Sequence, residues 1–118
     1  MHTLTAAAVQ MVSGTHPETN IDTMRRLVRQ AAKRGADWVL LPEYWPLMGA
    51  RDTDKLAFAE PLGAGAFQTA MSEIARECTI VLFGGTVPLP SGEAGKVLNT
   101  LLVYGRDGAP IGAYDKMH

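Results

Sequence analysis

The sequence predicts an α/β fold that starts with a parallel β-α-β-α-β unit and continues into antiparallel hairpin strands. Three short apolar runs, at residues 4–11, 37–42 and 79–85, alternate with two segments whose apolar residues recur every three or four positions. Apolar runs without a helical period are typical of buried strands, and the intervening pattern is typical of amphipathic helices. Strands that alternate with helices form a parallel sheet that the helices cover.

The first part of the chain supplies a strand, a helix and a second strand. The run LTAAAVQM at residues 4–11 is expected to be a buried strand, and the turn residues of 13–20 lead into a helix. From Ile21 onward the apolar residues form one stripe, and Gly35 follows as a typical helix stop. The run DWVLLP at 37–42 is the second buried strand.

The second part repeats this pattern and then changes. A second apolar stripe, from Phe67 to Ala75, precedes the third strand at 79–85. Pro, Gly and Ser residues then predict a loop over 87–96. Strands at 97–104 and 111–115, joined by a turn around Asp107-Gly108, complete an antiparallel hairpin.

Composition excludes several classes of protein. The length of 118 residues suits one domain or part of one, and a net charge of -1 leaves no basic footprint for nucleic acid. The apolar runs are too short to span a bilayer, and the first residues do not resemble a signal peptide. The single cysteine, Cys78, excludes an internal disulfide and suits a reducing compartment. We expect a cytoplasmic protein with no cofactor and no metal site.

Strand directions place three chemically interesting residues. Glu43 follows the second strand and Lys116 follows the fifth, so both are expected at the carboxyl edge of the sheet, where α/β proteins bind ligands. Cys78 precedes the third strand and is expected at the opposite edge, about 17–20 Å away. It is therefore interpreted as a structural cysteine.

Two segments carry a family resemblance. LLPEYWPLMG and AYDKMH resemble the two signatures of the carbon-nitrogen hydrolase (nitrilase) superfamily, and FGGTVP, NTLLVYGRDGAPIGAYDK and AAAVQM match its run in order. Within the superfamily, the chain is most similar to amidases of deaminated glutathione and related ω-amides. The resemblance implies the N-terminal half of the superfamily's α-β-β-α sandwich.

The resemblance also implies roles. The family uses Glu, Lys and Cys, and by position Glu43 matches the general base and Lys116 the catalytic lysine. The family's nucleophile lies beyond the lysine motif, so residues 1–118 correspond to a partial domain, truncated before the nucleophile and expected to be inactive alone. The implied substrate is a small amide or nitrile, and the implied assembly is a homo-oligomer, a dimer or larger. Neither nucleic acid nor membrane is an expected partner. A general base should also be partly buried.

Other interpretations remain open. Glu43 could be an ordinary loop carboxylate and Lys116 a solvated lysine, while Tyr44 and Trp45 are expected to pack beneath a loop. A non-catalytic fragment with one uncovered sheet face would act as an interaction or assembly module. A small flavodoxin-like ligand-binding domain would require a further crossover helix. The glycines of GAGAF at 63–67 are weak evidence for a phosphate site.

Overall fold

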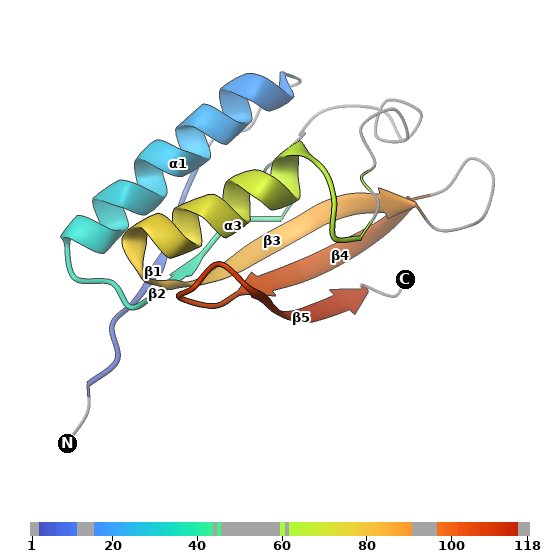
Figure 1. Ribbon diagram of the computed structural model, residues 1–118. Helices are drawn as coiled ribbons and strands as arrows, with labels where there is room; N and C mark the ends of the chain where they lie inside the picture. Colours follow the sequence, from blue (N-terminus) through green and yellow to red (C-terminus); the bar gives the residue numbers. More distant parts are fainter. Residues whose placement is uncertain are drawn as a thin grey trace.

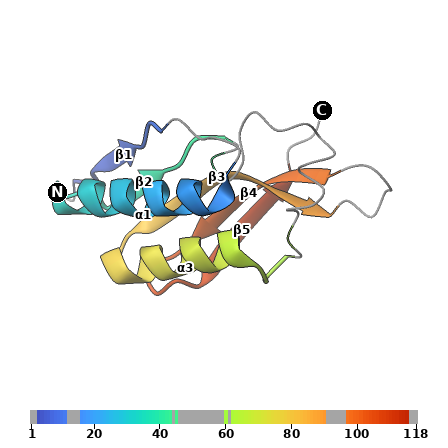
Figure 2. The same ribbon diagram turned by 90° about the horizontal axis from the view of Figure 1, so that it is seen from above.

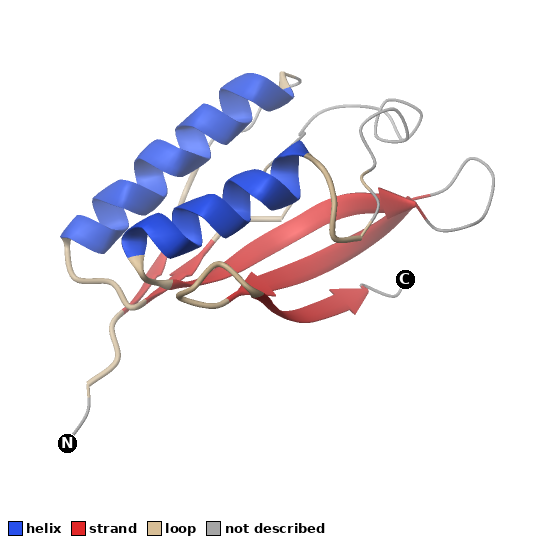
Figure 3. Cartoon of the chain, viewed as in Figure 1, coloured by secondary structure: helices blue, strands red, loops and turns tan. Residues whose placement is uncertain are grey.

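The elements follow the predicted order. A computed structural model describes residues 3–11, 16–43, 45, 60, 62–90 and 97–115, with only the backbone described for 86–90 and 97–99. Figure 1 and Figure 3 show the chain with its helices on one side of a sheet. The elements are β1 (Ala6–Ala8), α1 (Pro17–Lys33), β2 (Trp38–Leu40), α3 (Ala66–Cys78), β3 (Val81–Pro90), β4 (Val97–Tyr104) and β5 (Pro110–Asp115).

The described strands form one sheet in sequence order. Within the described residues, the five strands run β1-β2-β3-β4-β5 across it. Strands β1, β2 and β3 are parallel, whereas β4 is antiparallel to both β3 and β5. It follows that β5 runs in the same direction as β3. The predicted β-α-β-α-β unit followed by hairpins is confirmed.

Both helices lie against the same face of this sheet (Figures 1 and 2). Pro17 begins α1, where its missing N–H costs nothing, and Gly35 with a φ of +92° follows the last turn. The apolar stripes of the two helices are buried between the helices and the sheet. The described core residues with 0% exposure are Met24, Val28, Val39, Trp45, Met71, Ala75 and Leu82.

The sheet face away from the helices remains exposed. In β2, Val39 is fully buried while Trp38 and Leu40 are 37% and 40% exposed. The prediction that 37–42 and 4–11 are buried strands is therefore wrong in part, because in β1 as well Ala6 and Ala8 are exposed. Within the described residues, both helices cover the same face, so successive side chains alternate between core and surface.

Strand β3 extends further than predicted. Residues 87–90, expected in a loop, continue β3, and Pro88 and Pro90 pair with Asn99 and Val97 of β4. Proline cannot donate to a ladder and is confined to strand edges. Among the described residues, β2 pairs with β3 only as far as Phe83. Beyond Phe83, β3 therefore has one described neighbouring strand, β4, and its other side is open. This is where prolines are compatible with a strand.

Candidate active site

Glu43 lies just beyond the carboxyl end of β2. The Leu41 N–H donates to the Phe83 carbonyl oxygen at 2.8 Å and extends the pairing with β3 by one residue. Pro42 then ends the strand, and Glu43 sits exposed in the following turn. The sequence correctly predicted the position of Glu43 at this edge. The expectation of a partly buried carboxylate is wrong for this chain.

Two adjacent glycines, Gly84 and Gly85, allow β3 to lie close to α3 and to the end of β2. Gly85 has a φ of +64°, and a Cβ there would overlap the Pro42 carbonyl oxygen and lie 3.0 Å from that of Leu41. A Cβ on Gly84 would lie 2.5 Å from Met71 Sδ of α3. The end of β2 therefore reaches β3 because Gly85 has no side chain. This contact positions the backbone immediately before Glu43.

Trp45 anchors the other side of Glu43. Its side chain is fully buried, and Nε1 donates to the Gly84 carbonyl oxygen at 2.7 Å. Its ring meets Phe67 of α3 edge to face, with centroids 6.0 Å apart. Trp45 belongs to the hydrophobic core, whereas the sequence predicts only that it packs beneath a loop. Tyr44 lies outside the described residues.

The second predicted catalytic residue, Lys116, lies outside the described residues. The preceding residue, Asp115, ends β5, and its Oδ1 accepts a hydrogen bond of 2.7 Å from the Thr100 hydroxyl. Thr100 pairs with Val87 on one side and Asp115 on the other. Since Leu40 pairs with Phe83, the ends of β2 and β5 reach the same edge of the sheet. A contact between Glu43 and Lys116 remains a prediction.

Cys78 lies at the opposite edge. It ends α3 shortly before Val81, which pairs with Trp38, the first residue of β2. The five steps along the chain from Trp38 to Glu43 correspond to about 16 Å of extended chain. Burial raises the pKa of the Cys78 thiol, and the neighbouring Glu77 carboxylate adds to the effect. A nucleophilic cysteine needs a lowered pKa, so these features favour the structural role that the sequence predicts.

The sequence interpretation missed a buried carboxylate at the start of α3. Glu60 is 8% exposed and accepts the backbone N–H groups of Phe67 at 2.6 Å and Gln68 at 3.1 Å. Gly65, with a φ of +133°, leaves room for this carboxylate, which a Cβ there would overlap. A glycine before a helix that lacks a capping side chain was the available signal. Because Glu60 occupies these donors, the 63–67 segment does not form a phosphate site.

The described residues offer little for a metal or a membrane. Among them, no group of three or more His, Cys, Asp or Glu side chains could hold a metal ion. No helix in the described part of the chain has the length and apolar character needed to cross a bilayer.

The fold is that of carbon-nitrogen hydrolases. Residues 5–118 match the carbon-nitrogen hydrolase family, and the chain belongs to it. The chain is 34% identical over 113 residues to Omega-amidase NIT2 of Homo sapiens, covering 95% of this chain and 39% of that protein. It is 32% identical over 114 residues to a deaminated glutathione amidase of Synechocystis sp., and the match covers 96% of this chain and 41% of that protein. The chain thus spans about 40% of the length of these relatives.

Solved structures show the same fold. Nit3 of Saccharomyces cerevisiae, of the nitrilase superfamily, superposes with a TM-score of 0.84 at 23% identity, covering 98% of this chain and 44% of that one. An amidase of Nesterenkonia sp. AN1, with acrylamide added at its active site cysteine, superposes with a TM-score of 0.83 at 21% identity. The match covers 98% of this chain and 45% of that one. The predicted α/β fold, corresponding to part of the nitrilase-superfamily sandwich, is confirmed.

Proposed function

We propose that this chain contributes Glu43 and Lys116 to the active site of an amidase that hydrolyses a small carboxamide and releases ammonia. The observation that carries the proposal is the position of Glu43 at the carboxyl edge of parallel strands, between two buried anchors. The Leu41 to Phe83 hydrogen bond fixes the backbone before it, and Trp45 fixes the backbone after it. The names of the relatives, ω-amidase and deaminated glutathione amidase, support a carboxamide as the substrate.

The proposed reaction needs a thiol that this chain does not supply at the right edge. The Nesterenkonia amidase has an active site cysteine to which acrylamide adds, and this supports a cysteine nucleophile contributed by the rest of the protein. The Glu43 carboxylate accepts the thiol proton while sulfur attacks the amide carbon. The C–N bond then breaks, Glu43 returns the proton to the leaving ammonia, and a thioester remains. Water hydrolyses the thioester with Glu43 again acting as the base.

Lys116 stabilises the charge that develops on the amide oxygen. Strands β3 and β4 separate β2 from β5, and the usual spacing between strands places β2 and β5 about 14 Å apart. A gap of this size leaves room for a substrate between groups that follow the two strands. On this proposal, the carboxylate and the ammonium group approach the substrate from opposite sides.

Substitution of Glu43 tests the proposed base. In the protein that carries this chain together with its nucleophile, Glu43→Gln should lower kcat for ammonia release from succinamate by about 10²–10⁴-fold. Glu18→Gln, an exposed change in the first turn of α1, is the matched control and should leave kcat unchanged. Wild-type kcat in the Glu43→Gln protein would refute the role of base.

Substitution of Lys116 tests the proposed stabilising group separately. Lys116→Met should lower kcat by about 10²–10³-fold, the usual effect of removing one donor to a developing oxyanion. Lys33→Met, in the last turn of α1, removes the same charge far from this edge and serves as the control. An equal effect of the two substitutions would contradict a catalytic role for Lys116.

A second function, as an assembly module, is favoured by the exposed apolar face of the sheet. Trp38, Leu40 and Tyr114 are 37–70% exposed. We propose that this face becomes buried in the complete protein, which we further propose to be a cytoplasmic homo-oligomer. Native mass spectrometry of the complete protein tests the assembly, and a stable monomer would contradict it.

A further inference from the structure

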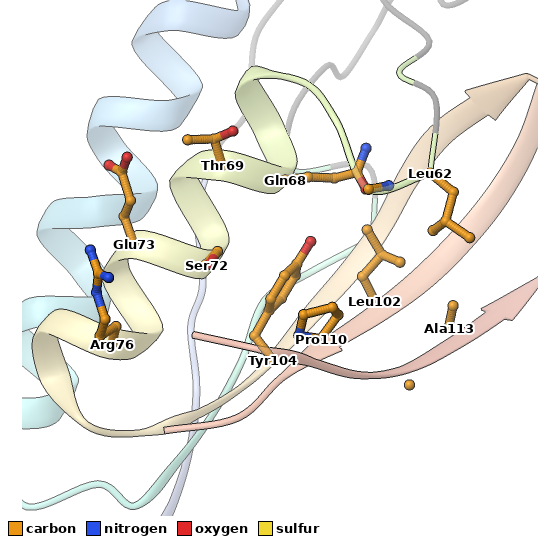
Figure 4. Close-up of a pocket in the computed structure, with 12 residues that line it drawn as sticks. Leu62, Gln68, Thr69, Ser72, Glu73, Arg76, Leu102, Tyr104, Pro110 and Ala113 are labelled. Atoms are coloured by element: carbon orange, nitrogen blue, oxygen red, sulfur yellow. The ribbon is translucent and has the colours of Figure 1, made fainter. Parts of the chain in front are cut away.

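A cavity of about 540 Å³ lies between α3 and the β4–β5 hairpin. Figure 4 shows the residues that line it. Leu62, Leu102, Pro110 and Ala113 supply apolar walls, while α3 contributes polar side chains. The volume is within the range of small-molecule sites, which are mostly apolar with a few placed polar groups.

A buried hydroxyl without a partner among the described residues points into this cavity. Tyr104 of β4 is 4% exposed, and no hydrogen bond to its hydroxyl is made by any residue that the structure describes. In Figure 4 the ring of Tyr104 stands with its hydroxyl toward the side of α3 that carries Ser72 and Gln68. Buried polar groups nearly always have a partner, so this hydroxyl is an available donor.

The surroundings of the Tyr104 hydroxyl determine its protonation state. Burial, together with the Glu60 carboxylate, raises the pKa of Tyr104 to about 12. The phenol therefore keeps its proton at neutral pH and can donate to an oxygen of a ligand. The Ser72 hydroxyl donates its hydrogen to the Gly108 carbonyl oxygen at 2.6 Å, and no hydrogen bond joins it to Tyr104.

The α3 wall of the cavity includes Arg76, whose guanidinium forms no ion pair with a carboxylate among the described residues. Glu73, one turn earlier, also lines the cavity and lies 3.8 Å from Arg25 of α1. A guanidinium available to a ligand beside a carboxylate favours a single negative charge over a dianion such as phosphate.

We propose that this cavity binds a small apolar monocarboxylate that carries a second oxygen acceptor, such as an oxo-carboxylate. The apolar body of the ligand contacts Leu62, Leu102 and Pro110. Its carboxylate binds the Arg76 guanidinium, and its carbonyl oxygen accepts the hydrogen of the Tyr104 hydroxyl. This site does not depend on the proposed function of Glu43, which is not among the residues that line the cavity.

Calorimetric titration of the protein that carries this chain with 7-oxooctanoate tests the proposal. Tyr104→Phe, which removes only the hydroxyl, should weaken binding about five- to tenfold. Octanoate, which lacks the ketone, should bind wild type more weakly by the same factor and should not respond to Tyr104→Phe. Arg76→Gln should weaken both ligands about tenfold and reduce the salt dependence of binding. Arg26→Gln, on the exposed face of α1, is the matched control and should have no effect.

Several results would overturn the proposal. These are the absence of saturable binding, equal affinity for 7-oxooctanoate in wild type and folded Tyr104→Phe, and displacement by inorganic phosphate at equal concentration. Circular dichroism establishes that each variant is folded. If Tyr104→Phe does not fold, the comparison of 7-oxooctanoate with octanoate on wild type decides, and equal affinities would overturn the role of the hydroxyl.

Discussion

At the scale of single residues, the position of Glu43 depends on neighbours that carry no charge. The chain before it approaches β3 only because Gly85 has no Cβ, and the chain after it is held by the buried ring of Trp45. The carboxylate itself was recognisable from the Pro-Glu motif. Its supports were not, because close approach of two backbones leaves no periodic pattern in a sequence.

Gly85→Ala should be strongly destabilising. The left-handed φ alone costs about 1–2 kcal/mol, and overlap with the Pro42 carbonyl oxygen adds to it. We expect a loss of more than about 2 kcal/mol in the free energy of unfolding, measured by urea denaturation. Gly112→Ala is the control, since a Cβ there meets only Val103 atoms at 3.9–4.0 Å. Equal stability of the two variants would contradict the close approach.

Tyr104 should make stability fall in alkaline solution. Its pKa is about 12 in the folded chain against 10.0 for the free group. Between these values the unfolded chain has lost the proton that the folded chain keeps, so stability decreases as pH rises from 10 to 12. The loss is about 2–3 kcal/mol. Urea denaturation across this range measures it, and Tyr104→Phe should abolish this component of the slope.

Tyr104 and Glu60 also show what the sequence could not provide. Their burial results from contacts between α3, β4 and the chain before α3. A single tyrosine in an apolar strand and a single acid in a loop are both ordinary sequence features. Neither residue falls within the two signatures, so the resemblance gave them no role.

At the scale of elements, the two helices are joined by a core and by ion pairs at its margin. Met24 and Val28 of α1 are fully buried. At the surface, Arg29 of α1 donates hydrogen bonds of 2.6 and 2.9 Å to the two carboxylate oxygens of Glu77 of α3. This contact raises the pKa of Arg29 and lowers that of Glu77, but both groups are open to solvent. The core therefore contributes more than the ion pair.

Two substitutions in α1 separate these contributions. Met24→Ala should lower the free energy of unfolding by about 2–5 kcal/mol, because it removes a fully buried side chain and leaves a cavity. Arg29→Ala should have little effect at physiological salt. Thermal and urea unfolding of both variants provide the measurement. A larger effect of Arg29→Ala than of Met24→Ala would reverse this ranking.

Glu60 should contribute to the stability of α3 in the way a capping residue does. Its carboxylate accepts two N–H groups in the first turn and interacts favourably with the helix dipole. Glu60→Gln retains the size but loses the charge, and we expect a loss of about 1 kcal/mol in the free energy of unfolding. Glu18→Gln, in the exposed first turn of α1, is the comparison and should cost less.

Elements differ in how well their sequences predicted them. The order of strands and helices, and the 97–104 strand, could be read from periodicity. The exposed face of β2 could not, because WVL is apolar at every position and only the arrangement of the helices decides which side chains are covered. The extension of β3 through two prolines ran against local propensity and depends on pairing with β4.

At the scale of the whole molecule, one layer of helices covers one side of one sheet in the described residues. The exposed apolar side chains on the other side should make the isolated 118-residue chain associate as its concentration rises. Leu40→Lys, at a position that is 40% exposed, should reduce this association. Sedimentation velocity over a concentration series measures both proteins. A wild-type chain that stays monomeric throughout would contradict the expectation.

The two prolines of β3 have a consequence for how the sheet can grow. Pro88 and Pro90 lie two positions apart, so both proline nitrogens point to the same side of β3, the side away from β4. The backbone N–H groups of Val87 and Leu89 then point toward β4. A foreign strand that approached the open flank of this segment would find two donors missing and could not complete a ladder. Growth of the described sheet is therefore directed to its outer strands, β1 and β5, and the long β3–β4 arm resists fibrillar stacking along its own flank.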